Sequence, residues 1–477
     1  MNSLVRCICA LAVHAVLVPF SVADPPTQDE ARETLRKVVS FYRSVGYEGA
    51  YLWKYAADLS AQEGEGVASR TSGWTQPPGT PAVGEALLTA WRLSGEQCCL
   101  DAAVEAAHAL VRSQLDSGGW SSHFDLGAEG RRRYRYRIDG DSAGRNDLTT
   151  LDDDKTQSAL LLLMHVDEAL GFSDSRIHEC VEYALKHLSA AQYPNGAWPQ
   201  QFSGPVEHQE QFPVLKASYP EDWPREYPKA KYISYYTLND NNMHHVAEMF
   251  LEAHRIYGRD DCRQSALRTG DFFILAQMPA PQPGWAQQYN AQMHPVWARK
   301  FEPPAISGGE GQGVIRTLLL LYEATADQRF LKPIPTAIDY YRRSRLENGK
   351  LARFYELQTN RPLYFTKDYQ LTYRDDDLPT HYGFIIGSDL DSLQKKYDDL
   401  QSRNPADLKL PHRQITRARL SSGTARRAES VVKQLDARGA WTETGRMEHS
   451  PAPVSLIDMR TLIRNLDDLA AYVGAEK

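Results

Sequence analysis

Cysteine is scarce in this sequence, with six residues among 477. Two of them, Cys7 and Cys9, precede residue 24, and the other four show no spacing typical of a zinc site. Long apolar runs are also lacking after residue 23, so we expect no segment that spans a membrane. Positive charge is not in excess, because 54 basic residues stand against 61 acidic ones, a net charge of −7. This balance argues against nucleic acid as a partner, and a polyanionic ligand would need a local basic site.

Residues 1–23 predict a secretory signal peptide. Arg6 supplies the positive start, an apolar stretch follows, and Ser21-Val22-Ala23 offers small residues for cleavage. The alternative interpretation is a buried first helix. We favour the signal peptide and expect a soluble protein that is secreted or exported to the periplasm.

Three turns of the chain end in the same way. Residues 114–120 read QLDSGGW, residues 192–198 read QYPNGAW, and Gln277 is followed by a Pro-rich turn that closes on Gly284-Trp285. Each turn follows a helix with apolar periodicity. A repeat of this length, built from helix pairs, predicts stacked hairpins around one continuous core. We therefore predict an all-α-dominated (α/α) toroid, with irregular or short β segments in its long loops.

The three- and four-residue apolar spacing gives the expected helices of this array. They are 30–45, then the hairpins 84–93 with 101–114, 155–170 with 177–192, 241–257 with 264–277, and 312–326 with 334–346. Residues 351–365 alternate aromatic and aliphatic side chains, which favours strand-like chain, and two more helices are expected at 425–435 and 455–473. We divide the chain into the signal peptide, a toroid domain at 24–380, and a C-terminal extension at 381–477 that is packed or mobile.

The four later cysteines allow three complete disulfide pairings. Cys99 and Cys262 stand at equivalent positions of different repeats, which we expect to lie apart in space. Buried thiols are therefore favoured for these two and for Cys98 and Cys180.

Two helix starts are rich in oxygen ligands. LDDDKT places Asp152, Asp153 and Asp154 before one helix, and TLNDNN places Asp240 at the matching point of the next repeat. One carboxylate would be enough to cap a helix, and three adjacent ones repel each other. Hard oxygen ligands at two neighbouring helix starts favour a Ca²⁺ site, although capping alone remains an alternative.

Several arginines predict a local basic cleft. Arg299 and Lys300 stand between Trp297 and Phe301, the segment ARFYELQTNRP contains Arg353 and Arg361, and residues 131–137 read RRRYRYR. Each arginine alone is compatible with a stacked structural role. Taken together beside the acids, they favour an acidic polymer as substrate over a neutral one.

The ordered motifs YPNGAWPQQF, TLNDNN, VWARKFEPPAISGGEG and ARFYELQTNRP resemble those of the family 10 polysaccharide lyases, the helical-toroid pectate lyases. The resemblance covers about Val83 to Phe365. It implies cleavage of polygalacturonate by calcium-assisted β-elimination, with Asp152 and Asp240 as acidic ligands of calcium and Arg299 as the proton-abstracting residue. It also implies that Arg361 and Arg353 clamp substrate carboxylates. We assign Lys300, Trp198 and Asn239, which stand in these motifs, to substrate binding.

The implied chemistry has a demanding step, because arginine is a weak base with a reference pKa of about 12.5–13.8. We expect neighbouring cations, Lys300 and calcium, to lower the pKa of Arg299. One departure from the family pattern is the run Asp153-Asp154-Lys155-Thr156, which replaces more usual neutral residues and is expected to alter calcium affinity.

Two other functions stay open at this point. A glycoside hydrolase of the same fold would use Asp152 and Asp240 as acid and base. A catalytically inactive relative would bind pectin without turning it over. In each case we expect a monomer that binds polysaccharide, with no nucleic acid and no membrane span.

Overall fold

The helices expected from the apolar spacing form two layers. The computed structural model describes residues 25–142, 144–229, 231–411 and 415–476, and the predicted signal peptide lies outside these ranges. Inner helices pack on one another in chain order, and so do the outer helices α3, α6 and α8. The inner helices are α2 (Thr80–Ser94), α5 (Lys155–Ala169), α7 (Asn242–Tyr257) and α9 (Gly308–Thr325). The outer helices are α3 (Gln97–Ser113), α6 (Ser175–Ala191), α8 (Asp260–Ala276) and α10 (Ile334–Arg343).

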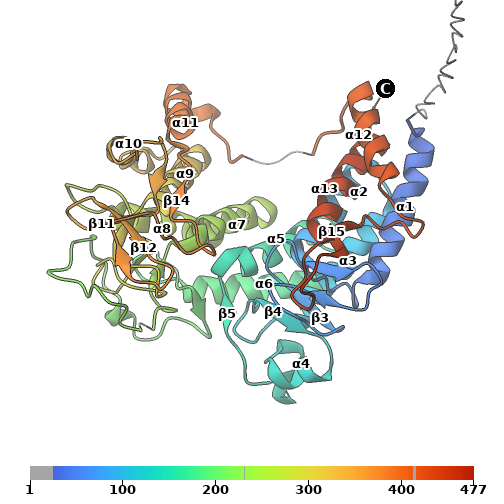
Figure 1. Ribbon diagram of the computed structural model, residues 1–477, viewed down its shortest axis with the longest axis horizontal. Helices are drawn as coiled ribbons and strands as arrows, with labels where there is room; N and C mark the ends of the chain where they lie inside the picture. The colour runs from blue at the N-terminus through green and yellow to red at the C-terminus, as the bar shows by residue number, and fades with distance from the viewer. Residues whose placement is uncertain (1–24, 143, 230, 412–414, 477) are drawn as a thin grey trace, which may run out of the picture.

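The two ends of the chain extend the same array. α13 (Met459–Val473) packs against α2 and α1 (Gln28–Val45), and α12 (Ser422–Lys433) packs against α13. At the other end α11 (Leu390–Ser402) packs against α9. Figure 1 shows the helices curving into an incomplete ring, with α11 and α12 at its two ends. The predicted toroid of helical hairpins is confirmed, and residues 381–477 contribute three of its helices.

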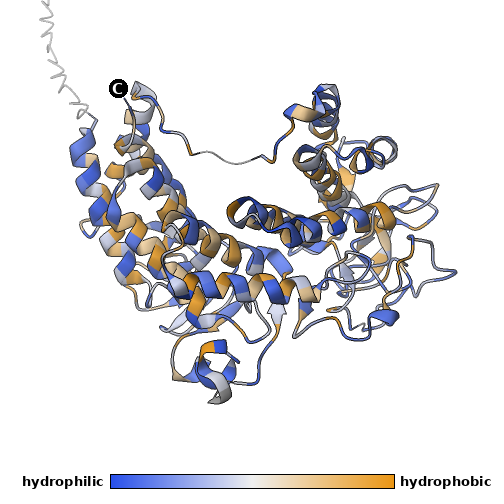
Figure 2. Cartoon of the chain, turned by 180° about the vertical axis from the view of Figure 1, so that it is seen from behind, coloured by the Kyte–Doolittle hydropathy of each residue, from blue (hydrophilic) through white to orange (hydrophobic). Residues whose placement is uncertain are grey.

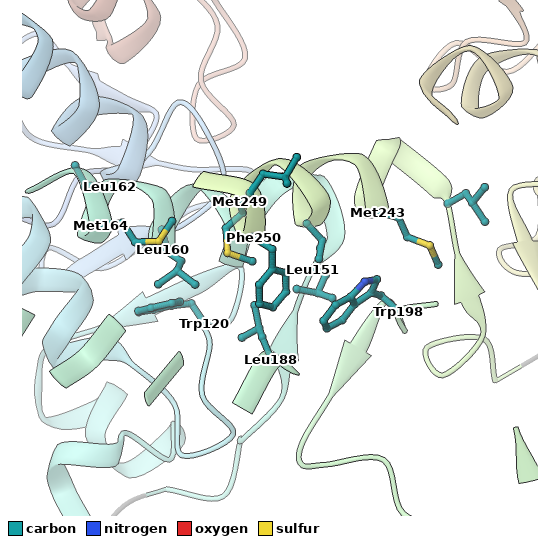
Figure 3. Packing of buried hydrophobic residues seen from close by; sticks show 14 of the residues in the cluster. Trp120, Leu151, Leu160, Leu162, Met164, Leu188, Trp198, Met243, Met249 and Phe250 are labelled. Carbon is teal, nitrogen blue, oxygen red and sulfur yellow. The ribbon is translucent and has the colours of Figure 1, made fainter. Parts of the chain in front are cut away.

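The repeated tryptophans form the core between the layers. Trp120, Trp198 and Trp285 are each 0% exposed. Their indole nitrogens donate to Leu110 O, Thr269 Oγ1 and Phe273 O at 2.9, 2.9 and 2.8 Å. Figure 3 shows Trp198 beside Phe250, with ring centroids 5.4 Å apart. Each tryptophan stands in the turn after an outer helix and buries its indole ring in the core. Its N–H is satisfied there by a hydrogen bond.

Short strands supplement the helices, and one of them corrects a prediction. The helix expected at 455–473 begins only at Met459, because Val454–Asp458 forms β16, which pairs with β1 (Lys54–Ala56). The Asp458 side chain then accepts from Arg460 N and starts α13. An alternating segment that meets a strand edge therefore overrides the helical periodicity there.

The strand-like reading of residues 351–365 is confirmed. β10 (Leu351–Ala352), β11 (Phe354–Glu356) and β12 (Pro362–Phe365) lie there. β11 joins β12 and β13 (Leu371–Thr372) to β9 (Ala305–Ser307) in a four-stranded sheet. Because β9 leads directly into α9, this sheet places its residues beside the first turn of that helix.

The helix faces, the cysteines and the lengths of the apolar helices can be compared with the predictions from the sequence. Figure 2 shows helices with an apolar face and a polar face, as a double layer requires. Cys98, Cys99, Cys180 and Cys262 are free thiols, and the last three are buried, whereas Cys98, also expected to be buried, is only partly buried. Within the described ranges, no helix has both the length and the apolar run needed to span a bilayer.

Candidate active site

Two short turns with the same backbone shape bring the acidic residues together. η2 (Asp152–Asp154) precedes α5, and η4 (Asn239–Asn241) precedes α7. Asp153 and Asp240 have φ values of 50° and 51°, in the left-handed region that Asp and Asn tolerate better than most residues. At neither helix does the N-cap side chain accept a hydrogen bond from the first turn. Asp154 at α5 and Asn241 at α7 therefore do not cap their helices through their side chains.

A two-stranded ladder beside each turn supplies a buried glutamine. Gln200 Nε2 donates to Asp152 Oδ1 at 2.9 Å, and Gln287 Nε2 donates to Asn239 Oδ1 at 3.0 Å. Both glutamines are buried, so each orients the first side chain of its turn. The ladders pair β5 (Thr149–Thr150) with β6 (Gln201–Phe202) and β7 (Tyr236–Thr237) with β8 (Gln288–Tyr289).

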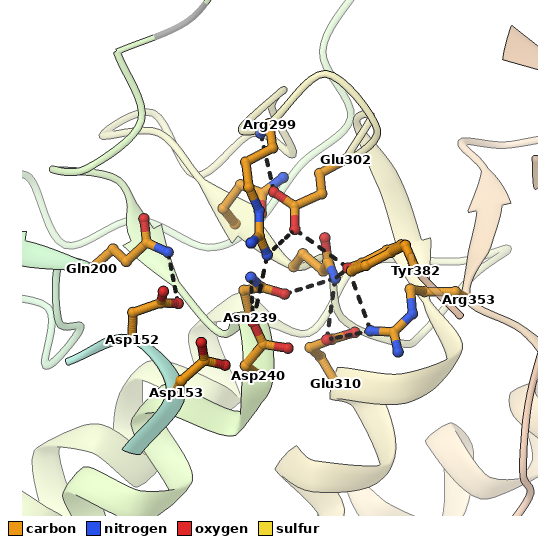
Figure 4. A network of polar contacts seen from close by, with 12 residues as sticks. Asp152, Asp153, Gln200, Asn239, Asp240, Arg299, Glu302, Glu310, Arg353 and Tyr382 are labelled. Atoms are coloured by element: carbon orange, nitrogen blue, oxygen red, sulfur yellow. Dashed lines mark hydrogen bonds and ion pairs between the residues drawn. The ribbon is translucent and has the colours of Figure 1, made fainter. Parts of the chain in front are cut away.

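Three carboxylates converge where the two turns meet. One oxygen from each of Asp152, Asp153 and Asp240 lies within 4.8 Å of the others. Lys155 Nζ lies 3.3 Å from Asp152 Oδ2 and 3.4 Å from Asp153 Oδ2. Asn239 Nδ2 donates to Asp240 Oδ2 at 2.9 Å. Figure 4 shows the three acids side by side, and we call them the acid cluster.

Arg299 lies directly against this cluster. Its Nη2 is 3.5 Å from Asp240 Oδ2 and donates to Glu302 Oε1 at 2.6 Å, while its backbone N–H donates to Glu302 Oε2. Burial disfavours the guanidinium charge, but the ion pair with Glu302 outweighs burial and raises the pKa of Arg299. The expected lowering is therefore wrong for the protein without a bound cation. Lys300, which was expected to lower it, is exposed and holds its ammonium 3.5 Å from the centre of the Tyr369 ring.

The polar network around Arg299 extends as far as Arg353. Glu310, in the first turn of α9, accepts from Gln287 Nε2 at 3.1 Å and from Arg353 Nη1 at 3.2 Å. The Tyr382 hydroxyl accepts from Gln287 at 3.0 Å and donates to Glu302 at 3.3 Å. The Arg353 guanidinium lies 4.6 Å from the centre of the Tyr382 ring. The network therefore holds Arg299 beside Asp240 and Glu302, and Arg353 beside Glu310, as Figure 4 shows.

Comparison with known proteins identifies the segment that carries this geometry. Residues 114–213 and 206–351 match a family model described as pectic acid lyase. Residues 114–351 belong to the pectic acid lyase family. The resemblance found in the sequence motifs is thereby confirmed, and the domain is one of polysaccharide lyases.

Solved structures similar to the chain are helical enzymes of several activities. A family 10 polysaccharide lyase from Cellvibrio cellulosa has 19% identity and a TM-score of 0.45, and the match covers 62% of this chain and 91% of that one. A mutant of that enzyme in complex with trigalacturonic acid has 18% identity and a TM-score of 0.45, covering 67% and 98%. A cellobiose 2-epimerase from Bacillus thermoamylovorans has 13% identity and a TM-score of 0.37, covering 78% and 98%. No curated protein matches the chain significantly.

The polar network of the pectic acid lyase domain includes residues that the sequence did not single out for the site. They are Gln200, Gln287, Glu302, Glu310 and Tyr382. Tyr382 and Arg353 also lie beyond residue 351, where the family match ends. A site for the pectic acid lyase domain is thus completed by the chain that follows it.

The acid cluster has the chemistry of a cation site. Three carboxylates supply hard oxygen donors of the kind that Ca²⁺ prefers. Burial, with the nearby charges of Glu310 and Asp153, raises the pKa of Asp240 to about 7. Burial is the largest cause of this shift and the neighbouring carboxylates add to it, so a cation bound among the three acids would favour the ionised form of Asp240. These residues therefore fit a bound calcium ion.

Three residues that we assigned to substrate binding make other contacts in the structure. Trp198 is fully buried and hydrogen-bonded, so its assignment to substrate binding is wrong and its role is core packing. Asn239 is 2% exposed, and its amide is used by Asp240 and Gln287, so it orients the cluster and does not face a ligand. Arg361 is exposed, with its guanidinium 3.5 Å from the centre of the Tyr373 ring, and belongs to a group around Glu356.

The arginine run at 131–137 does not join the cleft. Arg137 pairs with Glu179 of α6, and Arg135 pairs with Asp116. In Figure 1, α4 (Ala128–Arg133) projects from the array, well apart from α9 and β11. The expectation that this run adds positive charge to the site is wrong, because neighbouring acids neutralise it on another part of the surface.

The raised pKa values predict a stability that depends on pH. Burial and Glu248 also raise the pKa of Asp154 to about 7. Because the folded protein holds these protons more tightly than the unfolded chain does, this stabilisation is complete below about pH 4 and is lost as the pH rises through about 7. In chelator, we expect the Tm to fall by on the order of a few degrees between pH 5 and pH 8.

Thermal unfolding of the Asp240→Asn variant provides the control for this pH dependence. The amide does not titrate, so the variant should lose part of the slope and keep the part due to Asp154. Parallel Tm curves for the two proteins across the whole pH range would contradict the assignment to Asp240.

Proposed function

We propose that this protein is a pectate lyase that cleaves polygalacturonate by calcium-assisted β-elimination. The observation that carries the proposal is the convergence of Asp152, Asp240 and Arg299 on one polar network within a pectic acid lyase domain. A polyuronate needs both a cation site and arginines near its carboxylates, and the acid cluster with Arg299 and Arg353 offers this combination.

The acid cluster would hold calcium, with Asp152, Asp153 and Asp240 as its ligands. The ion, when bound, would neutralise the uronate carboxylate and so make the C5 proton more acidic. Arg353, whose guanidinium lies over the Tyr382 ring, would pair with a second carboxylate of the polymer. These contacts would orient the sugar so that C5 faces Arg299.

Proton removal is assigned to Arg299 together with Glu302. Arg299 rests as a guanidinium, so it must lose a proton before it accepts one. Glu302, 1% exposed and 2.6 Å from Arg299 Nη2, is the base within reach. We propose that one Nη2 proton passes to Glu302 as the C5 proton passes to Arg299. The C4–O bond then breaks to leave a 4,5-double bond, and the departing glycosidic oxygen takes a proton from solvent water.

The hydrolase alternative is less well supported. A glycosidase places its acid and its base on the two sides of the scissile bond. Here Asp152 and Asp240 lie side by side with Asp153, and Arg299 stands over the same group. This arrangement suits a shared cation better than separate acid and base roles.

The test is the growth of ultraviolet absorbance on polygalacturonate with and without chelator. A lyase forms an unsaturated uronide that absorbs, and we expect the absorbance to grow with calcium and to stop in chelator. New reducing ends without absorbance would indicate the hydrolase. Polymer binding with neither signal would indicate the inactive relative.

We also propose export, with cleavage of residues 1–23, and a monomeric state. Sequencing the N-terminus of the protein released from its host tests the first, with a start near residue 24 expected. Sedimentation at several protein concentrations tests the second.

A further inference from the structure

Lys155 is a buried ammonium inside the acid cluster. It is the first residue of α5, and its side chain is 6% exposed. The structure records two partners for its Nζ, Asp152 Oδ2 at 3.3 Å and Asp153 Oδ2 at 3.4 Å. These are two of the three carboxylates that form the candidate cation site.

The neighbouring repeat shows that the fold does not need a cation at this place. Asn242 is the first residue of α7 and is also buried, at 1% exposure. The turns before the two helices have the same left-handed backbone, with φ and ψ of 50° and 39° at Asp153 and 51° and 30° at Asp240. A neutral amide is therefore compatible with the same turn. The positive charge of Lys155 is explained by the neighbouring carboxylates and not by a requirement of the backbone.

We propose that Lys155 is a tethered counter-cation that competes with calcium for Asp152 and Asp153. Its ammonium donates to the same carboxylate oxygens that would ligate the ion, and it repels a divalent cation placed between them. It keeps the two acids oriented in the metal-free protein and lowers the affinity of the cluster for calcium. This inference rests on the cation site of the proposed function, but it concerns the strength of binding and not the reaction.

Calcium binding to Lys155→Asn is the decisive measurement. Isothermal titration of the full chain with calcium chloride should give a Kd at least about tenfold lower than that of the wild type, which corresponds to about 1.4 kcal/mol. Thermal unfolding supplies a second reading. Without its ammonium, the variant should melt at a lower temperature in chelator and gain more from calcium than the wild type does.

Two control variants test whether the effect depends on a positive charge at position 155 and not on the loss of any lysine. Lys54 also pairs with a buried carboxylate, Glu63, at 3.4 Å, but lies outside the cluster, so Lys54→Met should leave the calcium Kd unchanged. Lys155→Arg keeps the charge and should bind calcium within a few-fold of the wild type. If Lys155→Asn folds only in calcium, its refolding as calcium is added reports the same affinity.

An unchanged or higher Kd in Lys155→Asn would overturn the inference, and so would a Kd lowered equally by Lys54→Met or Lys155→Arg. Failure of the proposed function would look different. A protein without lyase activity whose Lys155→Asn variant binds calcium more tightly would refute the reaction and keep the counter-cation.

Discussion

Replacement of Arg299 by alanine is expected to lower the rate of absorbance growth on polygalacturonate by about a thousandfold. The side chain lies against Asp240 and Glu302, and it is the only group of the network to which we assign contact with C5. The acid cluster and Arg353 remain in the variant, so binding of an oligogalacturonate, measured by calorimetry in calcium, should stay largely intact. The loss should therefore fall on kcat and not on KM.

Two controls define what Arg299 contributes. Arg329 also pairs with a partly buried acid, Asp271, and its guanidinium lies 4.7 Å from the centre of the Phe330 ring, away from the acid cluster. Arg329→Ala should keep nearly full activity. Arg299→Lys keeps a charge but loses the Nη2 that contacts both Glu302 and Asp240, so it should stay close to alanine in rate. Activity near the wild-type level in either Arg299 variant would remove the residue from proton transfer.

Local signals in the chain are enough to predict most of the architecture. The hairpin helices follow from apolar spacing and from the repeated turn before each tryptophan, because both features depend on neighbours in sequence. The same repeat also brings the two acidic turns together, since equivalent points of adjacent hairpins share one face. The convergence of Asp152 with Asp240 was predictable on that ground.

The predicted array omits one further copy of the repeated turn, although the sequence contains it. Residues 434–441 read QLDARGAW, close to QLDSGGW at 114–120, and Trp441 is buried with its indole donating to Val431 O. This turn shows that the chain after residue 381 carries the same hairpin unit. We expected residues 381–477 to form a packed or mobile extension. In the described part of this segment, α13 packs on α2.

The supporting shell of the site was less predictable. Tyr382 reaches Glu302 and Gln287 from a loop far along the chain, and no local pattern links it to them. Glu302 stands three residues after Arg299 in Arg-Lys-Phe-Glu, a spacing that signals an ion pair, but its burial comes only from tertiary packing. The prediction for the pKa of Arg299 failed for this reason, because it counted the exposed Lys300 and missed the buried carboxylate.

The calcium requirement should depend most strongly on Asp240. Replacement by alanine removes one of three carboxylates from a cluster whose oxygens lie within 4.8 Å of one another. We expect the calcium concentration for half-maximal activity to rise by about a hundredfold, the upper end of the effect of losing a partner that only supports a ligand. Saturating calcium should then restore a large part of the rate, because Glu302 still holds Arg299 at 2.6 Å.

Asp271→Ala provides the matched control for this titration. Asp271 is another acid whose pKa burial raises, and its partner is Arg329 and not the cluster. Its loss should leave the calcium requirement unchanged. Because Asp240 also contacts Arg299, a fall in activity alone would not separate a ligand from a partner of the arginine. A shift of the calcium midpoint separates them, since a residue that only positions Arg299 would lower the plateau of the titration and leave its midpoint in place.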